Sequence, residues 1–229
     1  MIRTLKAMSA LLSYPSAELQ AAAGEIGAVL RAEALLPVPA LTALAPLLEE
    51  LATGDLYDLE ARYVALFDRS RSLSLNLFEH VHGESRDRGG AMVDLIETYR
   101  AGGFEPVTTE LPDHLPVLLE FLSLRPLAEA REMLGDAASI LARLRDRLER
   151  RDPAYASVLA ALLAIARVAP EPVQPAEEED PDDLAALDRA WEETQVTFGP
   201  DPNAGCPAAR DLLARMAPTK RPAWAGAAE

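Results

Sequence analysis

The chain has 229 residues, of which 49% are apolar, and it carries a formal net charge of −15. That much apolar content can fill a sizeable core, which excludes a chain that is disordered throughout. The acidic balance argues against nucleic acid or an anionic membrane as the main partner, because both are bound through clustered Lys and Arg.

Cysteine content and the pattern of apolar residues indicate the cellular compartment in which the protein works. Cys206 is the only cysteine, so one chain can form neither a disulfide nor a thiolate metal cage. The N-terminus shows no continuous apolar signal region. The longest apolar stretch, near residues 158–166, is far shorter than the roughly 20 residues that cross a bilayer. We therefore expect a soluble, cytoplasmic protein without direct membrane insertion.

Helical periodicity recurs through residues 1–168, and it begins with an apolar face formed by Leu5, Met8 and Leu12. Ser16 follows a proline and is a plausible N-cap for a helix that reaches about Arg31. The pattern predicts two consecutive helices at the start of the chain.

Prolines and helix-capping residues predict the helix boundaries in the next part of the chain, residues 37–77. Pro46 and the two prolines before it predict a short or kinked helix that ends near Gly54. Asp55 is then placed to cap a further helix. The stretch from Leu73 to Leu77 alternates with period two, but a lone strand would have no partner in a helical protein. We interpret it as a connection whose leucines dock on the core.

The second half shows more helix starts. One helix contains Tyr99 and ends at two glycines, and Asp113 and Asp136 are each predicted to cap a later helix. Pro116 falls in a first turn, where its missing N–H does no harm. Asp152, followed by proline, predicts the start of the last helix, which ends near residue 168.

Composition changes after residue 168. Residues 171–193 hold ten acidic residues and one Arg, interleaved with prolines. We predict a flexible acidic linker over residues 169–183, and a short helix with a loose tail over residues 184–229.

Residues 78–90 form the first polar segment, which is dense in charge and contains two of the three histidines. Glu79, His80, His82 and Glu84 offer metal ligands in principle, although alternating positions on a short loop rarely converge on one ion. The segment is also compatible with a salt-bridged helix start. We favour a surface for a protein partner, because such dense charge costs desolvation unless it serves recognition.

Residues 110–116 form the second polar segment, with Asp113 as a helix cap and His114 in the first turn. A cap is compatible with a binding role, since the exposed N–H groups of a helix N-terminus receive anionic groups. The chain shows no glycine-rich phosphate loop, nucleophile elbow or zinc-protease helix. No complete catalytic constellation is present, and we expect no enzymatic activity.

Three stretches taken together, residues 63–68, 77–89 and 110–116, resemble the NarJ family of nitrate reductase assembly chaperones. Pro112, Asp113 and His114 are similar to the signature of the wider TorD/DmsD group of redox-enzyme maturation chaperones. The resemblance covers residues 1–168 and excludes the acidic linker and tail.

The resemblance implies an all-α, single helical bundle domain. It implies a chaperone that binds the immature catalytic molybdenum subunit of respiratory nitrate reductase, partly through an N-terminal segment like a twin-arginine leader. The chaperone keeps this client competent until bis-molybdopterin guanine dinucleotide is inserted. It binds no cofactor permanently.

Both polar segments supply candidate client-binding residues, since a helical bundle offers a groove for a peptide and carboxylates can bind its arginines. Tyr63, Phe67, Leu115 and Leu119 could line a groove, but we favour core positions for them. The candidate client-binding residues are Glu79, His80, His82, Glu84, Arg86, Asp87, Arg88, Glu110, Asp113, His114 and Glu120.

Three alternatives stay open. The same fold could serve another molybdoenzyme. The chain could be a metal-dependent enzyme that uses His80, His82 and His114. It could also be a passive scaffold whose client binding is insensitive to Asp113 and Arg86. The oligomeric state is undetermined by the sequence.

Overall fold

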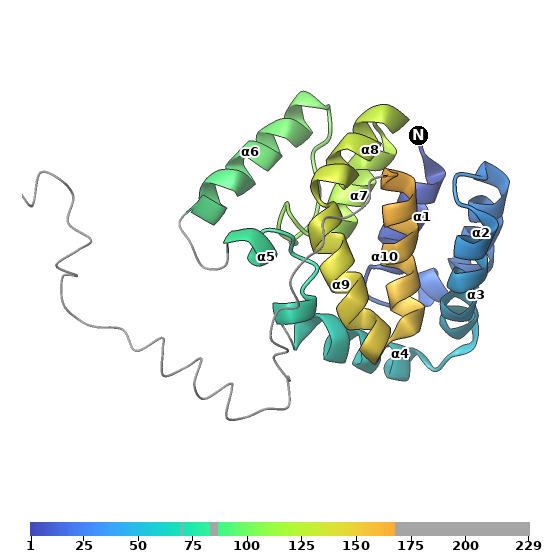
Figure 1. The fold of residues 1–229 in the computed structure, drawn as a ribbon. Helices are drawn as coiled ribbons and strands as arrows, with labels where there is room; N and C mark the ends of the chain where they lie inside the picture. Colours follow the sequence, from blue (N-terminus) through green and yellow to red (C-terminus); the bar gives the residue numbers. More distant parts are fainter. Residues whose placement is uncertain (70, 83–86, 168–229) are drawn as a thin grey trace, which may run out of the picture. The chain divides into compact units, whose positions relative to one another are not determined.

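The computed structural model describes residues 1–69, 71–82 and 87–167, without the side chain of His82. The described residues are mostly helical and form no strand, which confirms the predicted all-α class (Figure 1). None of the helices found there is long and apolar enough to cross a membrane. The elements are α1 (Arg3–Leu11), α2 (Ala17–Glu33), α3 (Val38–Thr53), α4 (Leu56–Tyr63), the π-helical turn η1 (Val64–Asp68), the 3-10 turn η2 (Arg71–Leu73), α5 (Glu79–His82), α6 (Asp87–Ala101), α7 (Leu115–Ser123), α8 (Leu127–Asp136), α9 (Ala138–Arg151) and α10 (Pro153–Ala166).

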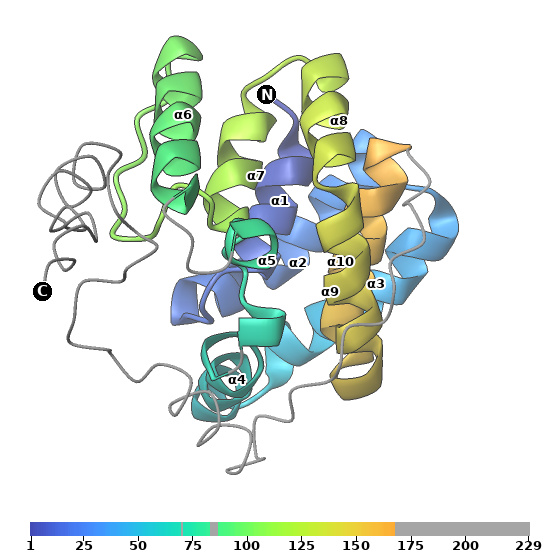
Figure 2. The same ribbon diagram turned by 60° about the vertical axis from the view of Figure 1, so that its left-hand side comes forward.

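Helix α10 lies at the centre of the bundle and packs against α9, α3 and α8 (Figure 2). Its side chains are apolar on nearly every face, and ten of its residues are buried. A helix that is apolar all round is stable only when neighbours cover it. The Asp152 carboxylate accepts a hydrogen bond from the Tyr155 N–H, and Pro153 is the first helical residue. This confirms the predicted start.

Helix α1 packs against both α2 and α7. Leu5, Met8 and Leu12 are fully buried, as their spacing predicts. The Ser16 hydroxyl accepts a hydrogen bond from the Leu19 N–H and caps α2. The Ser9 hydroxyl donates to the Pro116 carbonyl at 2.7 Å, which fixes α1 against the start of α7.

Two sequence-based expectations differ from the structure. Helix α3 ends at Thr53, next to Gly54 as predicted, but it is not short: it runs for 16 residues through Pro46, and Leu44 and Leu47 beside this proline are fully buried. Burial of this face outweighs the hydrogen bond that proline cannot make. Asp136 does not cap a helix either. It is the last residue of α8, and α9 begins after Ala137 without a side-chain cap.

The leucine-rich connection docks on the core, as predicted. Leu73, Leu75 and Leu77 are at most 4% exposed, and the backbone forms an isolated antiparallel bridge between Asn76 and His114. Two arginines of α9 hold the same stretch from the other side. Arg147 donates to the Ser72 carbonyl at 2.6 Å, and Arg143 donates to the His80 carbonyl at 3.3 Å.

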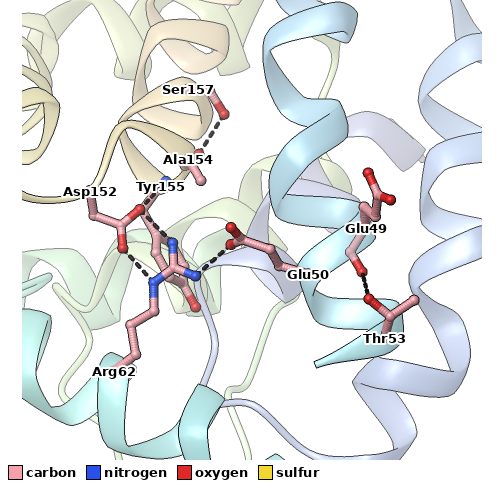
Figure 3. Close-up of polar contacts among 8 residues, drawn as sticks. All are labelled: Glu49, Glu50, Thr53, Arg62, Asp152, Ala154, Tyr155 and Ser157. Atoms are coloured by element: carbon pink, nitrogen blue, oxygen red, sulfur yellow. Dashed lines mark hydrogen bonds and ion pairs between the residues drawn. The ribbon is translucent and has the colours of Figure 1, made fainter. Parts of the chain in front are cut away.

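Arg62 joins three parts of the chain in what we call the Arg62 network, formed with Glu50, Asp152 and Tyr155. Its guanidinium donates to both oxygens of the buried Asp152 carboxylate and to Glu50 of α3 (Figure 3). It also lies 5.3 Å from the centre of the Tyr155 ring. The Asp152 hydrogen bonds raise the pKa of Arg62. The network fixes α4 against α3 and the start of α10.

Helix α6 lies at the edge of the bundle in both views (Figures 1 and 2), and Tyr99 is its one buried residue. The Tyr99 hydroxyl donates to the Pro112 carbonyl at 2.7 Å. After the helix, a Cβ on Gly102 would lie 2.6 Å from the Phe121 ring, so only glycine fits there. Gly103 has a φ of +71°, in the left-handed region that favours glycine. The two glycines direct residues 104–110 towards the start of α7.

Candidate functional site

A cleft of about 610 Å³, which we call the acidic cleft, lies beside the N-terminus of α7. Ser13 and Tyr14, which follow the end of α1, contribute to one wall. Residues 104–108 form another wall, and the start of α7 closes the site. Buried Tyr63 lies at its base, and its hydroxyl donates to the Leu12 carbonyl at 3.0 Å. The cleft therefore joins segments that are distant in the sequence.

Four carboxylates line the acidic cleft: Asp68, Glu105, Glu110 and Glu120. Among the described residues that line it, none is Lys or Arg. Lys6, outside the lining, donates to Glu120 at 2.8 Å, in a pair whose side chains are about half exposed. Most of the negative charge is thus left without a partner in the part of the chain that the structure describes. Such a cleft attracts cationic groups.

His114 lies in the acidic cleft as the N-cap residue of α7, although its side chain caps no backbone N–H. Its Nδ1 is buried without a hydrogen bond and lies 3.8 Å from Glu110 Oε2. Burial lowers the pKa of His114, and the nearby Glu110, Asp113 and Asp68 oppose that change. The ring is consequently neutral at neutral pH.

Asp113 is fully buried behind the cleft, and its predicted capping role is wrong. Its Oδ2 accepts a hydrogen bond from the Phe78 N–H at 2.9 Å, and its carbonyl accepts one from the Leu77 N–H at 3.1 Å. The carboxylate is therefore directed towards the leucine-rich connection and away from the helix start. Asp113 positions His114 by fixing the backbone around it.

The first polar segment lies elsewhere and does not line the cleft. The Glu79 carboxylate accepts from Arg88 at 3.1 Å, in an ion pair less than a quarter exposed that joins α5 to α6. His80 Nε2 lies 2.8 Å from the Ser74 carbonyl, and burial lowers the pKa of this imidazole. The neutral ring therefore donates its proton to that carbonyl. Asp87 is exposed at the start of α6.

The eleven candidate residues divide into three sets. Glu110, His114 and Glu120 are brought together in the acidic cleft, with Asp113 directly behind them. Glu79, His80, Asp87 and Arg88 form the separate α5–α6 region. Glu84 and Arg86 lie outside the described residues, as does the side chain of His82.

Sequence reasoning missed Asp68, Glu105 and Tyr14 as members of the site. Asp68 ends η1, and a π-helical turn frequently marks a functional site, but no sequence signal predicts this one. Glu105 reaches the cleft only because of the turn at Gly102 and Gly103. Tyr63, Phe67, Leu115 and Leu119 are at most 5% exposed, so they belong to the core. Tyr63 serves as both core and cleft base.

A metal site finds no support in the described part of the chain, where no group of three or more His, Cys, Asp or Glu side chains could hold an ion. The metal alternative also used His82 and Glu84, whose side chains lie outside that description. It therefore stays untested.

Comparison with known proteins identifies the family. The family model described as nitrate reductase delta subunit matches residues 16–161. The chain belongs to this family. It is 46% identical over 202 residues to the nitrate reductase molybdenum cofactor assembly chaperone NarJ of Escherichia coli K12, covering 86% of each chain. It is 34% identical over 164 residues to a probable NarJ of Bacillus subtilis, covering 70% of this chain and 86% of that one.

A solved structure shows a similar fold. The crystal structure of a redox enzyme maturation protein from Archaeoglobus fulgidus matches with a TM-score of 0.52 and 24% identity. It covers 71% of this chain and 91% of that one. The resemblance to this family, which rests on residues 63–68, 77–89 and 110–116, is confirmed at the level of family and fold. The relatives from Escherichia coli and Bacillus subtilis are named as assembly chaperones.

Proposed function

We propose that the chain is an assembly chaperone of respiratory nitrate reductase. It binds the immature catalytic molybdenum subunit and keeps that client competent for cofactor insertion. The observation that carries this proposal is the 46% identity to Escherichia coli NarJ across 86% of both chains. Identity at this level and coverage supports a shared client class as well as a shared fold.

The acidic cleft is the proposed place of client recognition. A leader-like N-terminal segment carries Arg, and a guanidinium forms charge-assisted hydrogen bonds with carboxylates. Asp68, Glu105 and Glu110 have no Lys or Arg partner among the described residues, so they are free to bind one. The neutral His114 ring beside them does not repel an incoming cation.

The α5–α6 region is a second, supporting part of this surface. Its Glu79–Arg88 ion pair and the His80 hydrogen bond are already satisfied internally. We assign these groups to holding α5 against α6 and against Ser74, while Glu84 and Arg86, which lie outside the described residues, are candidates for contact with the client.

The cofactor in this proposal is the client's own. Bis-molybdopterin guanine dinucleotide enters the catalytic subunit while the chaperone is bound, and the chaperone retains none of it. Since insertion precedes assembly of the enzyme, we place the chaperone in the cytoplasm.

Co-expression with the full-length catalytic subunit in cells unable to make the cofactor tests the proposal. The tagged chain should co-purify with the cofactor-free subunit and release it once cofactor synthesis is restored. A subunit that never co-purifies would overturn the proposal. Competition with leader peptides from other molybdoenzymes separates nitrate reductase from the alternative clients.

A further inference from the structure

A second hollow, which we call the α1–α2 groove, lies between helices α1 and α2 and has a volume of about 500 Å³. Ala7 and Ala10 of α1 and Ala22 of α2 contribute short side chains to it, and Leu19 and Ile26 add larger apolar ones. The lining also holds two basic and two acidic residues, Arg3, Lys6, Glu18 and Glu25, so its charges balance and its remaining surface is mainly apolar. Short side chains between two helices leave room for apolar side chains of a ligand.

The α1–α2 groove meets the acidic cleft. Ser13 and Tyr14 line both hollows, and Tyr14 is 49% exposed where they join. Its ring packs edge-on against Tyr63 at 5.5 Å, which keeps the ring at this junction. Lys6 lines the groove and donates to Glu120 of the cleft. The two hollows therefore adjoin at Ser13 and Tyr14.

We propose that the α1–α2 groove is the second half of the client site and takes apolar side chains that directly adjoin a basic residue held in the acidic cleft. This inference rests on the proposed function. The occupant is a partner segment with one Arg or Lys beside a short apolar run. Helix α1, with nine residues, is about 14 Å long, which matches about four residues of extended peptide.

Charge complementarity selects this occupant. A basic residue next to an apolar run satisfies the uncompensated carboxylates and the apolar walls at once. The chain's own residues 171–193 carry ten acidic residues and one Arg, so the cleft would repel them. A second copy of this acidic chain is disfavoured for the same reason.

The first test is titration of the full chain with three labelled synthetic peptides. The parent peptide has one arginine followed by four leucines between Gly-Ser flanks. In the second peptide glutamine replaces the arginine, and in the third serines replace the leucines. The parent should bind at least about tenfold more tightly than either derivative. Equal binding of the parent and the serine peptide would overturn the inference.

A pair of matched variants tests whether the α1–α2 groove is the apolar half of the client site. Ala22 lines the α1–α2 groove, whereas its neighbour Ala21 is exposed and does not. Ala22→Glu should weaken the parent peptide about tenfold and leave the serine peptide unchanged, because a buried carboxylate blocks the groove. Ala21→Glu adds the same charge and should change neither. If Ala22→Glu unfolds the chain, the milder Val29→Ser variant should weaken only leucine-bearing peptides.

Photo-crosslinking shows directly where the peptide binds on the chain. With a photoreactive phenylalanine in place of the last leucine, label should appear on residues 18–29, and Glu110→Gln should reduce it. Label confined to other parts of the chain would overturn the inference. If the full-length client co-purified equally well with wild type and with Ala22→Glu, the α1–α2 groove would not be part of the client site. The proposed function would still hold. No client bound by wild type would instead remove the proposed function.

Discussion

The Arg62 network and the acidic cleft are two charged regions of one helical bundle that differ in how fully their carboxylates are paired with cations. In the network, one arginine binds Asp152 and Glu50, and its guanidinium lies against Tyr155 (Figure 3). In the cleft, Glu120 is the one lining carboxylate that pairs with a Lys or Arg among the described residues, and this Lys6 lies outside the lining. The first region joins α3, α4 and α10 to one another. In the second, the Lys6–Glu120 pair links α1 to α7, and the other three carboxylates join no helices in the part of the chain that the structure describes.

The difference separates charge that stabilises the fold from charge that is kept for a partner. A buried carboxylate must be paired, and removal of its partner is strongly destabilising. Clustered carboxylates without a partner repel one another, which lowers stability slightly unless a cation binds. Local violations of good charge balance are expected at functional sites. This reasoning supports the proposal that the acidic cleft is the surface that recognises the client.

Removal of Arg62 should give the largest loss of stability. Asp152 is 6% exposed, so Arg62→Ala leaves its buried carboxylate with the Tyr155 N–H as its one remaining hydrogen-bond donor among the described residues. We expect the free energy of unfolding to fall by ~3 kcal/mol in urea denaturation. Glu50→Gln is the matched control: Glu50 is about half exposed, and its loss should cost less than ~1 kcal/mol. Equal losses would mean that Asp152 is not the buried partner that matters.

Replacement of Asp113 should be nearly as costly, although it lies directly behind the cleft. Asp113→Ala removes the acceptor of the Phe78 N–H, and we expect a loss of ~2 kcal/mol in the free energy of unfolding. Hydrogen exchange should show faster exchange at the Phe78 amide. Asp113→Asn keeps an acceptor oxygen and should recover much of the loss. A stable Asp113→Ala variant that fails only in client binding would instead make Asp113 a direct contact.

The helices and their caps were largely predictable because local rules decide them. Ser16, Asp55 and Asp152 each cap the helix that follows, as the sequence predicts. Asp113 was predictable as an important residue but not as an acceptor for Phe78, since that contact joins residues 35 positions apart. Tertiary pairing prevailed there over a local cap.

The acidic cleft was only partly predictable for the same reason. Glu110 and His114 were found from the polar pattern of residues 110–116, and Glu120 was a candidate as a carboxylate close to them in sequence. Asp68 and Glu105 reach the cleft only through the packing of η1 and the turn after α6. No local pattern distinguishes such residues from the many other exposed acids of an acidic chain.

Neutralising the cleft should weaken binding without loss of stability. The triple variant Asp68→Asn, Glu105→Gln, Glu110→Gln should bind an arginine-bearing leader peptide about tenfold more weakly, a loss of ~1.4 kcal/mol in binding free energy. Calorimetric titration should also show a weaker dependence of affinity on salt. The free energy of unfolding should stay within ~0.5 kcal/mol of wild type.

The control for this variant removes equal charge from exposed positions outside the cleft. Glu49→Gln, Asp94→Asn and Glu97→Gln together should leave the affinity for the same peptide almost unchanged. If both triple variants weakened binding equally, net charge would explain the attraction, and the comparison between paired and unpaired regions would fail.

The smallest expected effect is a decline of stability in mild acid, caused by His80 and His114. Burial holds the pKa of both rings below the ordinary value of 6.5. Above pH 6.5 both rings are neutral in the folded and unfolded chains, so their contribution is fully present. As the pH falls below 6.5, the unfolded chain takes up protons that the folded rings resist, and the free energy of unfolding falls. Urea midpoints from pH 7.5 to 5 measure this decline, which His114→Gln should reduce in part. An unchanged slope in that variant would mean that the His114 ring takes up its proton as readily in the cleft as in the unfolded chain.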